Sequence, residues 1–167
     1  GTGVVRVLQD SAEHISRQAG RAVIVDHVVV QNSSKPRSIE LPGHKISNEF
    51  ARVRDNPEIS IVALLLGGLE PARTLAIELL KSGKDLVTAN KALLAEHGPE
   101  LFEVAHKAGR SIAFEAAVAG GIPIVAAISE CLTGNQISSI RGILNGTSNF
   151  ILTKMEQDGS DYHEVLQ

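Results

Sequence analysis

The stretch that decides the fold is ISIVALLLGGLEP at residues 59–71, where a near-continuous apolar run ends in two glycines and a proline soon follows. A strand with so few polar positions is typical of a parallel sheet that is covered on both faces. Pro71 stands where helices commonly begin. The apolar positions after it recur at helical spacing until Gly83; they are Ala72, Leu75, Ala76, Leu79 and Leu80. The stretch therefore predicts a buried strand, a tight loop and an amphipathic helix.

The same alternation of strands and helices continues on both sides of this stretch. The elements predicted there are a helix at residues 4–19, a strand at 24–30, a loop at 32–46, a strand at 85–88, a helix that ends at Gly109 and a strand at 111–115. Such alternation implies right-handed crossovers and a parallel sheet. We therefore predict a doubly wound α/β domain over residues 1–118. It opens on a helix, although a domain of this kind normally opens on a strand.

The character of the sequence changes after Val118. AGGIP at residues 119–123 predicts a bend that leads into a second domain over residues 119–167. The elements predicted in this part are a helix at residues 124–132 with Cys131 on its inward face, a strand at 137–144, and a turn at 145–149 into a last helix.

Composition excludes several classes of protein. The chain has 16 Lys and Arg against 19 Asp and Glu, so it lacks the basic excess that a nucleic-acid surface needs. No apolar run is long enough for a transmembrane helix, so we expect no membrane partner. The single Cys131 rules out an internal disulfide and fits a reducing compartment, so a cytoplasmic protein is expected. The His residues are too scattered for a zinc site.

Two segments near the N-terminus could bind a nucleotide. GTG at residues 1–3 opens a helix, and helix starts bind phosphate through free N–H groups, although small residues there also serve packing. SSKPR at residues 33–37 follows the second expected strand of the domain, a position that faces the adenosine ribose in doubly wound domains. Lys35 and Arg37 without a carboxylate favour NADP over NAD. An ordinary solvated basic loop is an equally good interpretation.

Two further segments could bind small ligands. Lys91 follows the strand at residues 85–88 and so lies at the carboxyl edge of the sheet, where its ammonium could hold a carboxylate or a ribose, or polarise a carbonyl. EAAVAGGIP at residues 115–123 could direct backbone carbonyls toward a hard cation. Taken separately, an ordinary lysine at a helix start and a tight bend are the favoured interpretations.

Three segments together resemble homoserine dehydrogenases, in the family's order and at about its spacing. They are VTANKALLA at residues 87–95, FEAAVAGGIP at 114–123 and GILNGTSNFIL at 142–152. SKPR at residues 34–37 and LGG at 66–68 agree more weakly. The resemblance covers essentially the whole chain. It implies a Rossmann-like NAD(P)-binding domain without its first strand, followed by the start of an α+β catalytic and dimerisation domain.

The resemblance also implies an activity and a set of site residues. The activity is the reversible NAD(P)-dependent interconversion of L-homoserine and L-aspartate 4-semialdehyde in threonine, methionine and isoleucine biosynthesis. A full-length protein is expected to be a homodimer. The implied residues are Gly1, Thr2, Lys35, Arg37, Gly67 and Lys91 for the cofactor, Lys91, Gly146 and Thr147 for the substrate, and Glu115, Val118, Gly120 and Ile122 for a monovalent cation such as Na⁺.

Two departures from the family's pattern shape the expectation. Leu64 stands where members usually carry Glu, and the expected catalytic Asp and Lys would lie beyond Gln167. By this resemblance the chain begins inside its phosphate loop, at Gly1, and we expect it to be inactive by itself. A catalytically dead nucleotide-binding or dimerisation module is an alternative. A dehydrogenase of another amino-acid aldehyde is a third, which the turn at residues 145–149 argues against.

Overall fold

The computed structural model describes residues 1–41, 45–143 and 145–166. The chain separates into two compact units, Gly1–Gly120 and Gly121–Gln167. The domain boundary predicted from the sequence lies two residues earlier, after Val118. That the two units are the functional domains of the protein stays a prediction.

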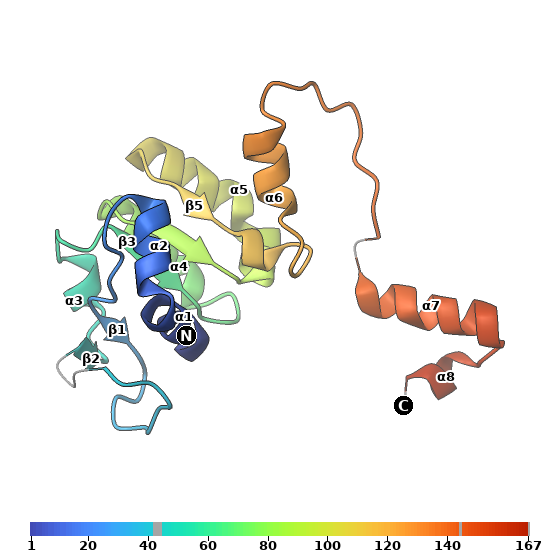
Figure 1. Cartoon of the computed structure of the whole chain (residues 1–167), viewed down its shortest axis with the longest axis horizontal. Helices are drawn as coiled ribbons and strands as arrows, with labels where there is room; N and C mark the ends of the chain where they lie inside the picture. The colour runs from blue at the N-terminus through green and yellow to red at the C-terminus, as the bar shows by residue number, and fades with distance from the viewer. Residues whose placement is uncertain (42–44, 144, 167) are drawn as a thin grey trace. The chain divides into compact units, whose positions relative to one another are not determined.

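The first unit alternates helices with short strands (Figure 1). Its elements are α1 (Thr2–Asp10), α2 (Ala12–Ala19), β1 (Val28–Val29), β2 (Ile46–Ser47), α3 (Ala51–Arg54), β3 (Ile61–Leu64), α4 (Ala72–Lys81), β4 (Asp85–Thr88), α5 (Lys91–Ala108), β5 (Ile112–Ala113) and the 3₁₀ helix η2 (Glu115–Ala117).

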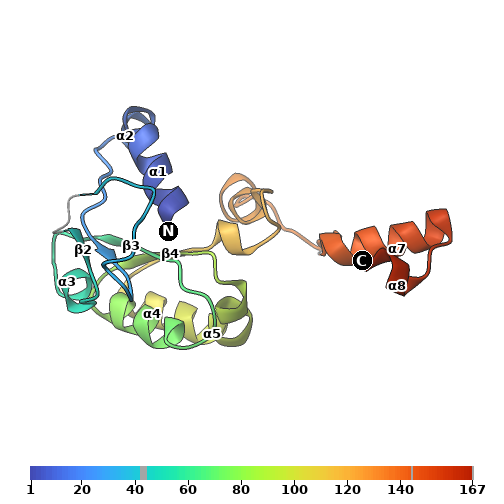
Figure 2. The same cartoon turned by 90° about the horizontal axis from the view of Figure 1, so that it is seen from below.

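All strand pairs of this unit are parallel. β1 pairs with β2, and β3, β4 and β5 form a three-stranded sheet in that order, with Leu64 opposite Thr88. Figure 2 shows α4 and α5 on one side of the strands and α1 and α2 on the other. The prediction of a parallel, doubly wound α/β arrangement is therefore confirmed.

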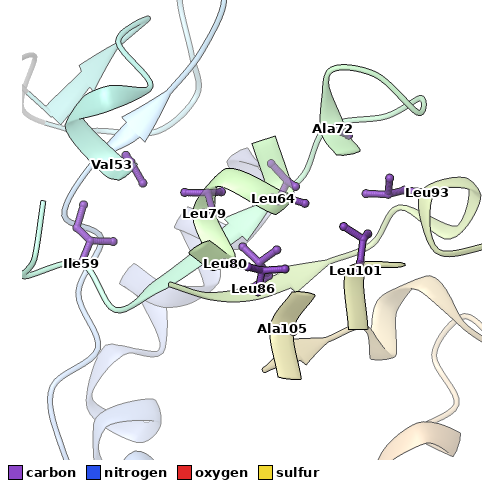
Figure 3. Packing of buried hydrophobic residues seen from close by; sticks show 11 residues of the cluster. Val53, Ile59, Leu64, Ala72, Leu79, Leu80, Leu86, Leu93, Leu101 and Ala105 are labelled. Atoms are coloured by element: carbon purple, nitrogen blue, oxygen red, sulfur yellow. The ribbon is translucent and has the colours of Figure 1, made fainter. Parts of the chain in front are cut away.

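The core of the unit lies between the three-stranded sheet and helices α4 and α5. Leu79 and Leu80 of α4 are completely buried, and Leu86 of β4 packs in the same cluster with Leu93 and Leu101 of α5 (Figure 3). The stripe predicted for α4 faces inward, with only Leu75 less than fully buried. The periodicity after Pro71 thus identified the helix face on which the unit depends for its core.

The prediction that both faces of β3 are covered was wrong. Leu64 of β3 is buried, but Ile61 is 52% exposed, and Ala63 and Val87 are exposed too. A parallel strand is covered only where helices pack against it, and α4 packs against one face of this sheet. Helices α1 and α2 leave these positions on β3 and β4 exposed.

The N-terminal elements are shorter than predicted. The expected helix at residues 4–19 is divided at Ser11 into α1 and α2, and Val5 is the buried residue of the pair. Only Val28–Val29 of the strand expected at residues 24–30 is regular, and its partner β2 begins at Ile46, where a loop was predicted. A strand with a single short partner has few ladder hydrogen bonds to extend it.

The second unit consists of short helices. They are α6 (Ile124–Ala126), a π-helical turn η3 (Ala127–Cys131), α7 (Gly146–Asp158) and α8 (Tyr162–Val165). None of its described residues is buried, so Cys131 is exposed, against the prediction of an inward position. The unit offers no core in which this side chain could be enclosed.

The strand predicted at residues 137–144 is also wrong. Residues 137–143 are irregular and exposed, and Leu144 lies outside the described residues. The described part of this unit contains no other strand, so the β-branched residues of this segment have no ladder to join. Across the described residues, no helix is long and apolar enough to cross a membrane.

An ion pair joins the two helices that cover the core. Arg73 of α4 donates from Nε to Glu100 Oε2 of α5 at 2.7 Å, and a second bond joins its Nη2 to Oε1. This hydrogen bonding and the charge of Arg73 hold the pKa of Glu100 below its ordinary value of 4.5. A carboxylate with a depressed pKa stabilises the fold above its unfolded-state pKa, and that stability is lost as the pH falls through the folded-state value.

We therefore expect Glu100→Gln to lower the melting temperature at neutral pH, and the difference from wild type to shrink as the pH is brought below 4.5. Thermal melts across this range measure it. Glu103→Gln is the matched control, because Glu103 pairs with Lys107 on the exposed surface of the same helix. A deficit at Glu100 that stayed constant with pH would show that the ion pair is not its cause.

Candidate cofactor site at the carboxyl edge of the sheet

Asn90 connects the loops that follow β3 and β4. Its Nδ2 donates to the carbonyl oxygen of Leu66 at 3.0 Å and to that of Gly68 at 2.6 Å, and its Oδ1 accepts from the amide of Leu93 at 3.0 Å. The last bond is an N-cap on α5. Asn90 is 9% exposed, so these bonds are nearly shielded from water.

Thr88 supports this arrangement from the end of β4. Its buried hydroxyl donates to the carbonyl oxygen of Leu64 at 3.1 Å and accepts from the amide of Asn90 at 3.2 Å. Leu64 itself is part of the buried core, so a leucine at this position is well accommodated. Leu64, which stands where family members usually carry Glu, therefore contributes to the packing of the core.

Two predicted cofactor residues lie on these connected loops. Gly67 is in the exposed loop after β3, and Lys91 is the exposed first residue of α5. The start of the long α5 helix carries a partial positive charge near Lys91, which favours an anionic ligand, while the amides of Lys91 and Leu93 already donate to Ala89 and Asn90. The structure thus brings Gly67 and Lys91 to one edge of the sheet, as their positions after parallel strands predict.

The other predicted nucleotide contacts lie on α1 and on the loop beside it. Gly1 is the N-cap of α1 and Thr2 its first residue. Arg6 donates to the carbonyl and the hydroxyl of Ser38, both at 3.3 Å, and Gln9 donates to the carbonyl of Glu40 at 2.9 Å. These bonds hold the loop that carries Lys35 and Arg37 against α1. Figures 1 and 2 both show the start of α1 beside the loop between β3 and α4.

Lys35 and Arg37 differ in their contacts. The guanidinium of Arg37 donates to the carbonyl oxygens of Asn32 at 2.6 Å, Lys35 at 2.7 Å and Ser33 at 3.4 Å. Arg37 therefore closes its own loop, whereas Lys35 is exposed. Both residues were predicted to contact a 2′-phosphate. In the structure, the guanidinium of Arg37 binds backbone carbonyls of its own loop, and Lys35 is exposed on that loop.

The predicted cation ligands lie on the connection between the two units. Glu115 opens η2, Val118 is extended, and Gly120 has a left-handed backbone with φ +61°. Ile122 belongs to the second unit, so the structure gives no joint geometry for the four residues. In the described ranges, no group of three or more His, Cys, Asp or Glu residues could hold a metal ion. A site made of backbone carbonyls stays a prediction.

The predicted substrate residues Gly146 and Thr147, which were expected in a turn before the last helix, already belong to that helix. They are the first two residues of α7, and Asn145 caps it by accepting from the amide of Ser148 at 2.8 Å. They belong to the second unit, whereas Lys91 belongs to the first. The expected meeting of Lys91 with Gly146 and Thr147 around a substrate stays a prediction.

Asn90 was not among the predicted site residues. No role was predicted for it from the sequence, although Asn directly before a helix is a common N-cap signal. That signal would have identified the bond to Leu93. It could not have identified the bonds to Leu66 and Gly68, because these depend on the pairing of β3 with β4.

A parallel α/β unit whose helix starts and glycine-bearing loop gather at the carboxyl edge of the sheet belongs to the Rossmann-like class of dinucleotide-binding domains. The family model of the homoserine dehydrogenase NAD-binding domain matches residues 1–115, and that of homoserine dehydrogenase matches residues 123–167. The chain belongs to the homoserine dehydrogenase family.

Individual relatives agree over nearly the whole chain. It is 43% identical to a homoserine dehydrogenase of Synechocystis over 99% of its length and 41% identical to that of Bacillus subtilis over 100%. A crystal structure of a homoserine dehydrogenase from Thiobacillus denitrificans matches 99% of the chain at 44% identity with a TM-score of 0.83. The chain spans only 38% to 39% of the length of these relatives.

Proposed function

We propose that this chain is the NAD(P)-binding part of a homoserine dehydrogenase, which interconverts L-homoserine and L-aspartate 4-semialdehyde in the biosynthesis of threonine, methionine and isoleucine. The observation that carries the proposal is the match to the family's NAD-binding domain over residues 1–115. The helix starts of α1 and α5 and the loop after β3 support it, because together they form a site suited to a dinucleotide. Several relatives carry the same name, so a catalytically dead module is not favoured.

Different residues of the first unit would contact different parts of the cofactor. Backbone N–H groups at Gly1 and Thr2 would hold the pyrophosphate, since the start of α1 favours negative charge. Lys91 would contact the nicotinamide side of the cofactor and the substrate through its ammonium. The bound cofactor supplies or accepts the hydride. By resemblance, the proton for the alkoxide comes from an Asp and a Lys that are not among these 167 residues. The proposal is therefore tested by cofactor binding and not by turnover.

The remaining assignments concern the whole protein. Gly146 and Thr147 would contact the substrate, and the carbonyls of Glu115, Val118, Gly120 and Ile122 would hold a monovalent cation. A homodimer is proposed because the second unit exposes several large apolar side chains, which a partner subunit could cover; they include Ile140, Ile143, Phe150 and Leu152. A cytoplasmic location fits a single free cysteine.

The test is a titration of the chain with NADPH, followed by the change in nicotinamide fluorescence. We expect saturable binding, and we expect Lys91→Met to weaken it about tenfold, because one charge-assisted contact is lost. Lys81→Met is the matched control, since Lys81 is an exposed lysine in the last turn of α4, away from the helix starts. No binding by the wild-type chain would refute the proposal. Equal weakening by both variants would refute the role of Lys91.

A further inference from the structure

We propose that Asn90 is a positioning residue for the cofactor, because it fixes the loop after β3 so that the amides of Gly67 and Leu69 face an oxygen acceptor of the bound dinucleotide. The inference rests on the proposed function and adds Asn90 and Leu69 to the residues that shape the site. It depends on the two bonds from Asn90 Nδ2 to the carbonyls of Leu66 and Gly68.

The direction of the amides follows from peptide geometry. In a planar trans peptide, the carbonyl of one residue and the N–H of the next point in opposite directions. The peptide bonds after Leu66 and Gly68 are trans. Because both carbonyls point toward the side chain of Asn90, the amides of Gly67 and Leu69 point away from it.

These two amides are available to a ligand. The loop from Leu65 to Glu70 is exposed, and neither amide donates to any residue that the structure describes. Gly68 has φ +76°, a left-handed conformation that glycine adopts readily and other residues rarely adopt. Because glycine is also flexible, the two hydrogen bonds from the nearly buried amide of Asn90 restrict this loop from the end of the neighbouring strand.

A second link between the same two strands provides a matched control. Lys84, which is buried just before β4, donates to the carbonyl of Asn56 in the segment before β3. Asn90 and Lys84 thus connect the chain around β3 and β4 at opposite ends of the strands. Of these two links, the one from Asn90 lies at the carboxyl edge. A purely structural role therefore predicts similar effects for the two variants, whereas a positioning role predicts an effect on cofactor binding for Asn90 alone.

The decisive variants are Asn90→Ser and Lys84→Met, compared with wild type. Serine retains a short neutral oxygen that can cap α5, but it cannot reach the two carbonyls. If Asn90→Ser does not fold, Asn90→Asp keeps the cap and the shape without the amide donor. Circular dichroism and melting temperature report on folding, and nitrogen-15 relaxation of Gly67, Gly68 and Leu69 reports on the order of the loop without cofactor.

We expect the loop to be ordered in wild type and in Lys84→Met and to lose order in Asn90→Ser. We expect NADPH affinity to fall about tenfold in Asn90→Ser and to change little in Lys84→Met. An ordered loop in the Asn90 variant, or equal losses of affinity in both variants, would overturn the inference. If the wild-type chain does not bind NADPH, the proposed function fails, and the loop order measured without cofactor still decides the role of Asn90.

Discussion

Replacing Leu80 with alanine is expected to lower the free energy of unfolding of the first unit by about 3 kcal/mol. Leu80 is 0% exposed and lies in the cluster that joins α4 to the sheet, close to Leu86 (Figure 3). The substitution removes the transfer energy of the side chain and leaves a cavity that close-packed neighbours cannot fill without moving. A unit with a single small core has few other contacts to compensate for the loss.

Urea titrations followed by circular dichroism measure this change. The matched control is Ile24→Ala in the same unit, where the side chain is 74% exposed and the change should stay within about 0.5 kcal/mol. A loss at Leu80 no greater than that at Ile24 would show that the core does not lie between the sheet and α4. The midpoint should shift without a change in the slope if the native unit keeps its compactness.

The elements that sequence analysis predicted well are those whose environment is local. Helical periodicity predicts the buried face of α4, and Gly109 marks the end of α5. The four residues of β4 fit between these two helices in the sequence, and α4 packs against both β4 and α5. The elements predicted less well depend on distant partners. Val28–Val29 is short because β2 is short, and residues 137–143 remain irregular because the described part of their unit supplies no second strand.

The candidate site shows the same contrast between features that local sequence predicts and features that depend on distant parts of the chain. Positions such as Gly67 and Lys91 could be placed at the carboxyl edge because every parallel strand ends there. The hydrogen-bond roles of Asn90 and Arg37 could not, because they depend on which backbone carbonyls come within reach after folding. A basic residue in a loop near the ribose position has the same pattern whether its charge points to a ligand or back to its own backbone.

Because their contacts differ, we expect substitutions of Lys35 and of Arg37 to have different effects on the binding of NADPH and NADH. Lys35→Ala should weaken NADPH binding by about tenfold or more while leaving NADH binding almost unchanged, because the lost ammonium would contact only the 2′-phosphate. Arg37→Ala should weaken both cofactors. Its guanidinium donates to three carbonyls of the loop, so its removal loosens the loop that both cofactors would contact.

Titrations of both variants with NADPH and NADH measure the two effects, with Lys154→Ala as a control for the loss of one positive charge elsewhere on the surface. Lys154 pairs with Asp158 on α7, far along the chain from the loop. Raising the salt concentration should reduce the advantage of NADPH in wild type and have little effect in Lys35→Ala, because screening acts mainly on exposed charges. If Lys35→Ala weakened both cofactors equally, the ammonium would not read the 2′-phosphate. If Arg37→Ala weakened NADPH alone, its guanidinium would leave the loop carbonyls to bind the phosphate when the cofactor is present.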